Sequence, residues 1–231
     1  MKGTSESSKI WYLENIDIFK EMPKKMMQYV EEHTQMCFLK KGEYIYFNGD
    51  ESNHVYFVKM GRVKVCAFSP NEGKEIIKVL LGSGEFFGEQ FILGQKNRDD
   101  FAQALDNNTL LCKMPAEEFE QLMAENIDLT LRVTKLIGFR LKKVERRLES
   151  LIFKDSRSRI VDFLKDLAEE KGERVGFETV VRNFGLTHKD ISNLTATSRQ
   201  TVTTVLNDLR SKNLIYFDRK RILFRDLEGM A

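Results

Sequence analysis

The sequence predicts an α+β protein in which a β-roll is followed by a long helix and a small helical domain that carries a β-hairpin. Three observations support this prediction. Short strand patterns separated by glycine-containing turns recur at roughly ten-residue intervals up to Met114. After Pro115 the apolar residues recur at helical spacing. Near the C-terminus, two short helical patterns precede two short strand patterns. We expect boundaries at 1–115 for the β-roll with its N-terminal helices, 116–153 for the long helix and 154–231 for the C-terminal domain.

The composition is that of a globular protein with a sizeable core. Of the 231 residues, 42% are hydrophobic and 31% are charged, and the net charge is only +2. A nucleic-acid surface would therefore be a local basic patch and not the whole molecule. The N-terminus lacks the apolar centre of a signal peptide, and no apolar run approaches the ~20 residues of a membrane helix. We expect a cytoplasmic protein without a membrane partner.

The predicted strands are typical of an antiparallel barrel or jelly roll. They cover Cys37–Leu39, Tyr44–Phe47, Val55–Val58, Val63–Phe68, Ile76–Leu80, Phe101–Leu105 and Thr109–Met114. Before them, helical spacing from Ile10 to Val30 predicts short helices interrupted at Pro23. We expect Met26 and Met27 to fill the core there.

The long helix carries an apolar seam along one face. The seam consists of Val133, Ile137, Leu141, Val144, Leu148 and Leu151, at three- and four-residue steps. Such a seam suits pairing with a second copy of the chain, so these residues are the predicted dimer interface. The alternative is that the seam packs wholly within one chain. A hinge at 154–158 then precedes an amphipathic helix that ends at Gly172.

Residues 187–213 have the pattern of two helices joined by a short turn. Thr187 and Asp190 have the spacing of a capping box, which begins the first helix. Ser198 can cap the second helix by accepting a hydrogen bond from a first-turn amide. The apolar stripe of the second helix consists of Val202, Val205, Leu206 and Leu209. Asn213 suits the left-handed conformation that often ends a helix.

The start and the opposite face of the second helix are polar. They carry Ser198, Arg199, Gln200, Thr203 and Thr204. Arg can bind O6 and N7 of guanine, Gln can pair with adenine, and Thr can bond to a base or touch a thymine methyl group. An ordinary amphipathic helix would explain the apolar stripe alone, but the preceding helix and turn favour a helix-turn-helix. These polar residues are the predicted DNA-reading set.

Two strand patterns, 214–217 and 222–225, flank a charged turn and predict a β-wing. From Arg199 to Arg225 the chain has seven Lys or Arg residues and two Asp residues. A local positive excess of this kind suits contact with DNA phosphates. The predicted phosphate contacts are Lys212, Arg219, Lys220 and Arg221.

Two sets of motifs occur in order on either side of the long helix. The N-terminal set is Gly42-Glu43-Tyr44-Ile45, Gly49-Asp50, Tyr56-Phe57-Val58, Gly61-Arg62-Val63 and Gly84-Glu85-Phe86-Phe87-Gly88-Glu89. The C-terminal set is Leu186-Thr187-His188-Lys189-Asp190-Ile191 and Thr197-Ser198-Arg199-Gln200-Thr201-Val202. With these motifs, roughly residues 15–225 resemble the transcription factors of the cyclic-AMP receptor protein and fumarate–nitrate reduction regulator (Crp/Fnr) family.

The resemblance implies a β-roll of the cyclic-nucleotide-binding type, a dimerisation helix and a winged helix-turn-helix. It also implies a homodimer that binds a palindromic operator in double-stranded DNA, with recognition helices one turn apart, roughly 34 Å. RNA polymerase is the further partner expected for such a regulator. By the same resemblance, Arg199 and Gln200 match the main base-reading pair, whereas Thr204 stands where the cyclic-AMP receptor has a second reading Arg. The operator should therefore differ at that base.

The resemblance also marks a candidate effector pocket, formed by Phe87, Gly88, Glu89, Gln90, Arg98, Asp99, Val144 and Glu145. Cyclic-nucleotide members use a Gly-Glu pair for the ribose and an Arg followed by Ser or Thr for the phosphate. Here Asp99 and Asp100 follow the Arg, and a carboxylate would repel a phosphate. The adenine-contacting Thr and Ser of the long helix are replaced by Val144 and Glu145. We expect cyclic AMP not to bind, an internal Glu89–Arg98 ion pair to shape the roll, and either another small effector or none.

Other cofactors of the family fit this sequence poorly. An iron–sulfur cluster needs four Cys ligands, and only the scattered Cys37, Cys66 and Cys112 are present. Their odd number and spacing favour reduced, buried thiols. A haem would need an axial His or Cys ligand, and the candidates in the β-roll domain are His33, His54, Cys37 and Cys66. We expect neither group and no metal site.

Two rival interpretations remain open. The chain could be a ligand-binding module that acts through protein partners, with the winged helix serving only assembly, or it could be a cyclic-nucleotide-responsive or effector-independent regulator. An enzyme is not expected, because the sequence has no P-loop, nucleophile elbow, paired metal-ligand motif or dinucleotide fingerprint.

Overall fold

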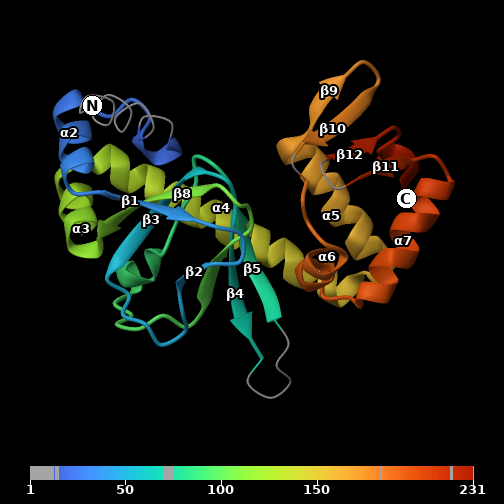
Figure 1. Cartoon of the computed structure of the whole chain (residues 1–231), viewed down its shortest axis with the longest axis horizontal. Helices are drawn as coiled ribbons and strands as arrows, with labels where there is room; N and C mark the ends of the chain where they lie inside the picture. Colours follow the sequence, from blue (N-terminus) through green and yellow to red (C-terminus); the bar gives the residue numbers. More distant parts are fainter. Residues whose placement is uncertain (1–12, 14–15, 70–74, 183, 219–220, 231) are drawn as a thin grey trace. The chain divides into compact units, whose positions relative to one another are not determined.

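The computed structural model describes residues 13, 16–69, 75–182, 184–218 and 221–230. Internal contacts divide the chain into two compact units, Met1–Arg140 and Leu141–Ala231. The α+β class, with a β-roll, a long helix and a C-terminal helix-turn-helix, is confirmed (Figure 1). None of the helices in the described residues is long and apolar enough to cross a membrane.

The β-roll consists of two four-stranded antiparallel sheets. In sheet order, the first contains β1 (Gln35–Leu39), β8 (Thr109–Pro115), β3 (His54–Met60) and β6 (Phe86–Phe87), and the second contains β2 (Tyr44–Tyr46), β7 (Phe101–Ala104), β4 (Val63–Phe68) and β5 (Glu75–Leu81). The seven predicted strands are confirmed, and each of their ends lies within two residues of the predicted position. The two-residue strand β6 was missed, because its alternation is too short to read in sequence.

Apolar side chains from both sheets fill the space between them. They are Tyr46, Val58, Val63, Val65, Leu81, Phe87, Ala102 and Leu111. The turn between β3 and β4 depends on Gly61, whose φ is +82°. A Cβ atom there would lie 2.8 Å from Oγ1 and 3.0 Å from Cα of Thr109. Only glycine fits this turn, because both the backbone conformation and the close neighbour exclude a side chain.

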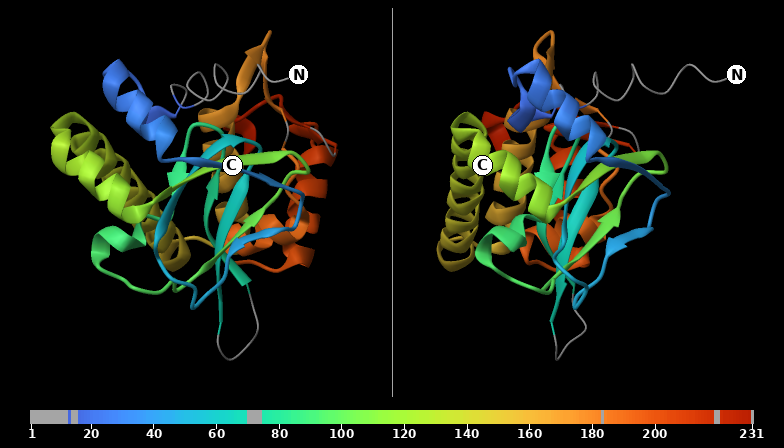
Figure 2. Two further views of the ribbon diagram at one scale, coloured as in Figure 1. Left: turned by 60° about the vertical axis from the view of Figure 1, so that its left-hand side comes forward. Right: turned by 90° about the vertical axis from the view of Figure 1, so that its left-hand side faces the viewer.

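A second core lies where helices cover the first sheet. The 3₁₀ helix η1 (Asp17–Phe19) and α2 (Lys24–Glu32) pack with α3 (Ala116–Glu125) and the start of α4 (Ile127–Phe153). Figures 1 and 2 show α2 and α3 together on one side of the roll. Pro23 is the residue before α2, as predicted, and Met27 is buried in this core with Met26 packed against it.

The expected single helix over 116–153 is in fact two helices, α3 and α4. Asn126 between them has an extended conformation, and its side-chain oxygen accepts a hydrogen bond from the Leu129 amide at 3.0 Å. This is the geometry of a helix cap, so α4 begins afresh. Val133, the first predicted seam residue, is only 1% exposed and belongs to the helix-covered core. It therefore packs within its own chain.

The C-terminal unit combines the α-helices α5, α6 and α7 and the end of α4 with a four-stranded antiparallel sheet (Figure 1). After the end of α4 come α5 (Ser156–Lys171), β9 (Glu173–Val175), β10 (Glu178–Arg182), α6 (His188–Thr195), α7 (Arg199–Ser211), β11 (Ile215–Phe217), β12 (Arg221–Phe224) and the 3₁₀ helix η3 (Glu228–Met230). The sheet order is β11-β12-β10-β9. The predicted hinge is shorter than expected, because Asp155 caps α5 by accepting from the Ser158 amide.

The helix-turn-helix follows its predicted caps closely. Thr187 and Asp190 form the capping box of α6, and Asn213 after α7 has a φ of +60°. The apolar stripe of α7 is buried as predicted. Strand β9 was missed, because all three of its residues are exposed and give no apolar alternation.

The capping box generates a stability prediction. Thr187→Ala should lower the free energy of unfolding of the C-terminal unit by about 1 kcal/mol, because an α6 amide loses its hydrogen-bond acceptor. The matched control is Ser211→Ala, at an exposed position in the last turn of α7, which should stay within about 0.5 kcal/mol of wild type. Urea unfolding followed by circular dichroism measures both. Equal stabilities for the two variants would contradict this account of α6.

Candidate nucleic-acid interface and effector site

Helix α7 presents its polar residues because its two ends and its apolar stripe are fixed. The Ser198 hydroxyl accepts from the Thr201 amide at 2.9 Å, so the helix begins at Arg199. The buried stripe faces the core of the C-terminal unit. Arg199, Gln200 and Thr204 are consequently exposed, as predicted. Their free side-chain donors and acceptors can reach base edges if α7 enters a major groove.

Thr203 differs from its neighbours on α7. Its hydroxyl donates to the Arg199 carbonyl oxygen at 3.0 Å and lies 2.8 Å from Nδ1 of His188 in α6. The His188 ring also contacts the Phe217 ring edge-on, with centroids 6.1 Å apart. The Thr203 hydroxyl therefore links α6 to α7, which leaves its methyl group as the part suited to a base contact.

The described phosphate-contact candidates lie in exposed ion pairs. Lys212 Nζ is 3.2 Å from Oδ2 of Asp208, which also pairs with Arg157 at 2.7 Å. Arg221 Nε is 3.4 Å from Oδ2 of Asp218 across the wing turn. Exposed pairs of this kind are weak, so a phosphate can replace the carboxylate at modest cost. Arg219 and Lys220, the other two candidates, lie outside the described residues.

Two residues suited to the interface were missed in the sequence. Asn207 is exposed and lies two helical turns after Gln200, on the same face of α7, and Asn can pair with adenine. Arg210 lies over the rings of Tyr216 and Phe217 in β11, with its guanidinium carbon 5.6 and 5.8 Å from their centroids. Asn207 could have been predicted from helical spacing. The stacking of Arg210 could not, because it depends on where β11 lies in the folded domain.

In the β-roll, Arg98 is almost completely buried, with 2% of its surface exposed. Nη1 donates to the Gly88 carbonyl oxygen at 2.9 Å, and Nη2 donates to the His54 carbonyl oxygen. The guanidinium carbon lies 4.5 Å from the centroid of the Tyr46 ring and 5.9 Å from that of Tyr56. Both terminal nitrogens are thus already used, and two aromatic rings surround the charge.

The expected Glu89–Arg98 ion pair is wrong. Glu89 instead pairs with Arg140 of α4, whose guanidinium also donates to the Phe86 carbonyl oxygen and lies 5.3 Å from the Phe86 ring centroid. The physical reason is that Arg98 already has two carbonyl acceptors and two aromatic neighbours. Sequence spacing could not show that a residue about fifty positions away would supply the charge.

Asp99 and Asp100 form a network with two residues from other elements. Lys78 Nζ in β5 lies 2.9 Å from Asp99 Oδ1 and 3.1 Å from Asp100 Oδ2. The side-chain amide of Gln90, in the 3₁₀ helix η2 (Glu89–Leu93), donates to both carboxylates. The Lys78 hydrogen bond holds the pKa of Asp99 below its ordinary value, whereas burial raises the pKa of Asp100 despite Lys78. These four residues therefore form one charged cluster at the predicted pocket.

The remaining pocket candidates fall into two groups. Phe87 is buried and stacks on Tyr56 with centroids 5.1 Å apart. Val144 and Glu145 belong to α4 in the C-terminal unit, where Val144 is 58% exposed, and their place in the pocket stays a prediction.

Among the described residues, no three His, Cys, Asp or Glu side chains are grouped so that they could hold a metal ion. Cys66 and Cys112 are buried, and Cys37 is half-buried.

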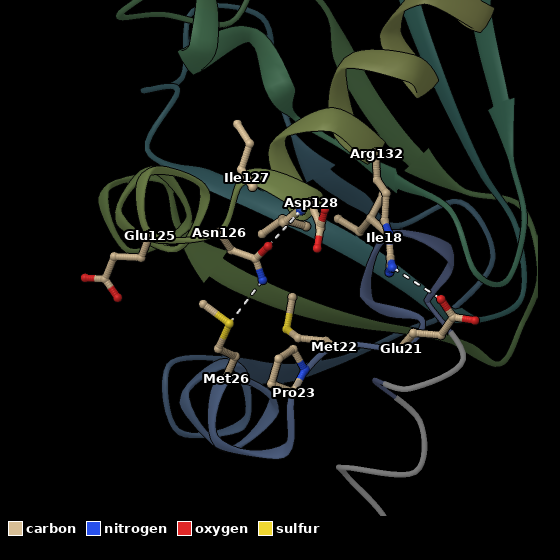
Figure 3. A pocket seen from close by; sticks show the side chains of 11 residues that line it. Ile18, Glu21, Met22, Pro23, Met26, Glu125, Asn126, Ile127, Asp128 and Arg132 are labelled. Atoms are coloured by element: carbon tan, nitrogen blue, oxygen red, sulfur yellow. Dashed lines mark hydrogen bonds and ion pairs between the residues drawn. The ribbon is translucent and has the colours of Figure 1, made fainter.

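A separate hollow of about 320 Å³ lies between the segment before α2 and the start of α4 (Figure 3). Its lining combines apolar residues such as Met22 and Met26 with charged residues such as Asp128 and Arg132. The Asn126 amide donates to the Met26 sulfur at 3.0 Å, and Arg132 lies 3.6 Å from Glu21. Asn126 thus joins α2 to the start of α4, which makes this hollow a part of the helix packing and not of the predicted pocket.

Two family models match the chain in the expected order. A cyclic nucleotide-binding domain matches residues 36–126, and a Crp-like helix-turn-helix domain matches residues 158–231. The global nitrogen regulator of Nostoc sp. is 30% identical over 184 residues, which cover 79% of this chain and 82% of that protein. The chain belongs to the Crp/Fnr family of transcription regulators. The resemblance stated from the sequence is therefore confirmed.

Other members of the Crp/Fnr family match across nearly the whole chain. A CRP-like cAMP-activated global transcriptional regulator from Mycobacterium tuberculosis is 24% identical over 214 residues, 93% of this chain and 94% of that protein. A CooA mutant from Carboxydothermus hydrogenoformans has a TM-score of 0.74 at 25% identity, covering 91% of this chain and 90% of that one. This Crp/Fnr member thus has both of the family's domains, a DNA-binding helix-turn-helix and a domain of the cyclic-nucleotide-binding type.

The pocket geometry generates a steric prediction at Gly88. Its φ is +88°, and a Cβ atom there would lie 3.0 Å from the His54 carbonyl oxygen and 3.2 Å from Arg98 Nη1. Gly42 has a similar φ of +87° and nothing within 4 Å. Gly42→Ala should cost about 1–2 kcal/mol for the backbone conformation, and Gly88→Ala about 1–3 kcal/mol more, because it displaces Arg98. Thermal unfolding of both variants tests this. If the two variants lost the same amount of stability, Arg98 would not need the space that Gly88 leaves open.

Proposed function

We propose that this Crp/Fnr member is a homodimeric, sequence-specific DNA-binding regulator of transcription in the cytoplasm, and not an enzyme. One observation carries the proposal. The cap at Ser198 and the buried stripe of α7 leave Arg199, Gln200 and Thr204 exposed on one helix face. Arg and Gln are the side chains that best distinguish guanine and adenine in a major groove.

In this proposal, Ser198, Arg199, Gln200 and the methyl group of Thr203 contact the bases, with Thr204 beside them. Lys212, Arg221 and the wing residues Arg219 and Lys220 contact phosphates, which positions the domain without specifying a sequence. The exposed Asn207 adds a further base-reading amide. RNA polymerase is the protein partner that we propose for a regulator bound beside a promoter.

A dimer would form along the exposed part of α4. Ile137, Leu141, Val144, Leu148 and Leu151 are all exposed in the single chain, from 37% to 58%. Their steps of four, three, four and three residues match a coiled-coil seam. The seam begins one turn after the buried Val133. Two chains paired in this way would place two α7 helices on the two halves of a palindrome, roughly 34 Å apart.

For the β-roll we propose that cyclic AMP is not the effector. Both terminal nitrogens of Arg98 donate to backbone carbonyls, and Glu89 is paired with Arg140. The groups that would meet a phosphate and a ribose therefore have protein partners already. A protein-interaction module without operator binding is the second candidate function. The basic wing and the polar face of α7 favour DNA.

The test of DNA reading starts from an operator selected out of a random duplex library with the purified wild-type chain. Arg199→Ala should lose about 1–3 kcal/mol of discrimination at one base pair in each half-site, because a bidentate contact is lost. Lys212→Ala is the matched control. It should weaken binding to all sequences alike and lower the salt dependence by about one counterion. Fluorescence anisotropy at several salt concentrations measures both. Equal binding of selected and random duplex by the wild-type chain would refute the proposal.

The test of dimerisation uses the seam itself. Leu141→Lys with Leu148→Lys should convert the protein to a monomer and lower operator affinity, because two charges would face an apolar partner. Lys142→Glu, a charge change at an exposed α4 residue outside the seam, should leave the dimer intact. Sedimentation equilibrium gives the mass of each species. A monomeric wild-type chain at micromolar concentration would reject the dimer.

A further inference from the structure

The charged groups at the candidate effector site all have partners within the protein. Lys78 faces Asp99 and Asp100, and Arg140 faces Glu89. The third cation, Arg98, donates to two carbonyl oxygens under the Tyr46 ring. These six residues of the Met1–Arg140 unit carry three positive and three negative formal charges, so this part of the site is neutral before any ligand arrives.

The buried polar atoms of the site that form no hydrogen bond also disfavour binding of an anion. Among the described residues, Asp100 Oδ1, Gln90 Oε1 and Arg98 Nε are buried and form no hydrogen bond of regular geometry. Two of these three atoms are acceptors. A phosphate diester offers only acceptors, so it could satisfy Arg98 Nε but would add charge beside two acceptors that already lack donors.

Lys78 and Gln90 offer the positive charge and the hydrogen-bond donors that a bound anion would need, but Asp99 and Asp100 already occupy them. Lys78 contributes a cation at 2.9 and 3.1 Å from the two carboxylates, and Gln90 contributes amide hydrogens. Partial burial alone would lower the pKa of Lys78, yet its bonds to Asp99 and Asp100 raise it overall. The ammonium is therefore committed to these carboxylates. Asp100 is buried within the cluster, whereas more than half of the Asp99 side chain is exposed.

We propose that the Asp99 carboxylate is a built-in anion of the β-roll. Held by Lys78 and Gln90, it takes the place of a ligand phosphate and determines that the site does not accept phosphate-bearing ligands. Removing it should turn Lys78 and Gln90 into donors for an external anion. This inference rests on the proposal that the roll is the effector site, and it assigns the ligand-charge specificity of that site to Asp99 and Lys78.

The experiment measures anion binding by the full-length dimer with two probes, cyclic AMP and inorganic phosphate. Wild type should show no binding of either probe up to millimolar concentration in isothermal titration calorimetry. Asp99→Ser should bind at least one probe at least about tenfold more tightly, because the variant removes the carboxylate that occupies Lys78 and Gln90. Adding Lys78→Met to Asp99→Ser should abolish the gain. Asp99 is exposed enough for the single variant to fold, and circular dichroism checks this directly.

The matched control is Asp106→Asn, which removes another carboxylate of the same unit. Asp106 forms a two-point ion pair with Arg62, at 2.7 and 2.9 Å, away from the Lys78 cluster. The Asp106→Asn variant should bind neither probe more tightly than wild type, although its net charge changes by the same amount as in Asp99→Ser. Phosphate binding without cyclic AMP binding would support the built-in anion and show that the rest of the site excludes a nucleoside.

Two results would overturn the inference. One is micromolar binding of cyclic AMP by wild type. The other is a folded Asp99→Ser variant that binds both probes no more tightly than wild type or Asp106→Asn. Operator binding of the same proteins is measured in parallel. A wild-type chain that fails to recognise an operator refutes the proposed function. If operator binding is intact but Asp99→Ser binds neither anion probe more tightly than wild type, only the role of Asp99 is refuted.

Discussion

A buried guanidinium organises the β-roll. Burying a charge is costly unless hydrogen bonds and polarisable neighbours replace the lost water. Arg98 meets this requirement through the carbonyl oxygens of Gly88 and His54 and through the Tyr46 ring. The Arg98 amide donates to the Asp50 carbonyl oxygen, and the Arg98 carbonyl oxygen accepts from the Gly49 amide. Arg98 therefore joins the turn after β2 to the segment before β7. The lack of a side chain at Gly88 leaves the space that this arrangement needs.

The same arrangement explains how a family motif can persist with different chemistry. The Gly-Glu pair and the Arg that cyclic-nucleotide members use are both present, yet each is engaged with the protein itself. Arg140 on α4 provides the partner for Glu89, and Lys78 provides the partner for Asp99 and Asp100. Family membership thus establishes the fold and the DNA-binding domain, whereas the partners of individual charges decide what the pocket accepts.

The C-terminal domain depends on local signals to a greater degree. The capping box at Thr187 and the cap at Ser198 fix where α6 and α7 begin, and the apolar stripe fixes which face of α7 is buried. Those three features suffice to expose Arg199 and Gln200. His188 and Thr203 then lock the two helices together, and Arg210 stacks on the wing. The polar face of α7, which we propose contacts bases, is therefore produced mainly by short-range sequence, and tertiary contacts hold it in place.

The sequence by itself determined the elements whose cause is local. They are seven strands of the roll, the two helices of the helix-turn-helix with their caps, the wing, and the polar face of α7. It failed where the cause was a distant neighbour. Val133 continues the seam in sequence but is buried, because α2, α3 and the first sheet close over that turn of α4. Glu89 and Arg98 looked like partners, but Arg140 and two backbone carbonyls supplied closer ones. Charge pairing depends on which side chains meet in space within a few ångströms, and only the folded chain decides that.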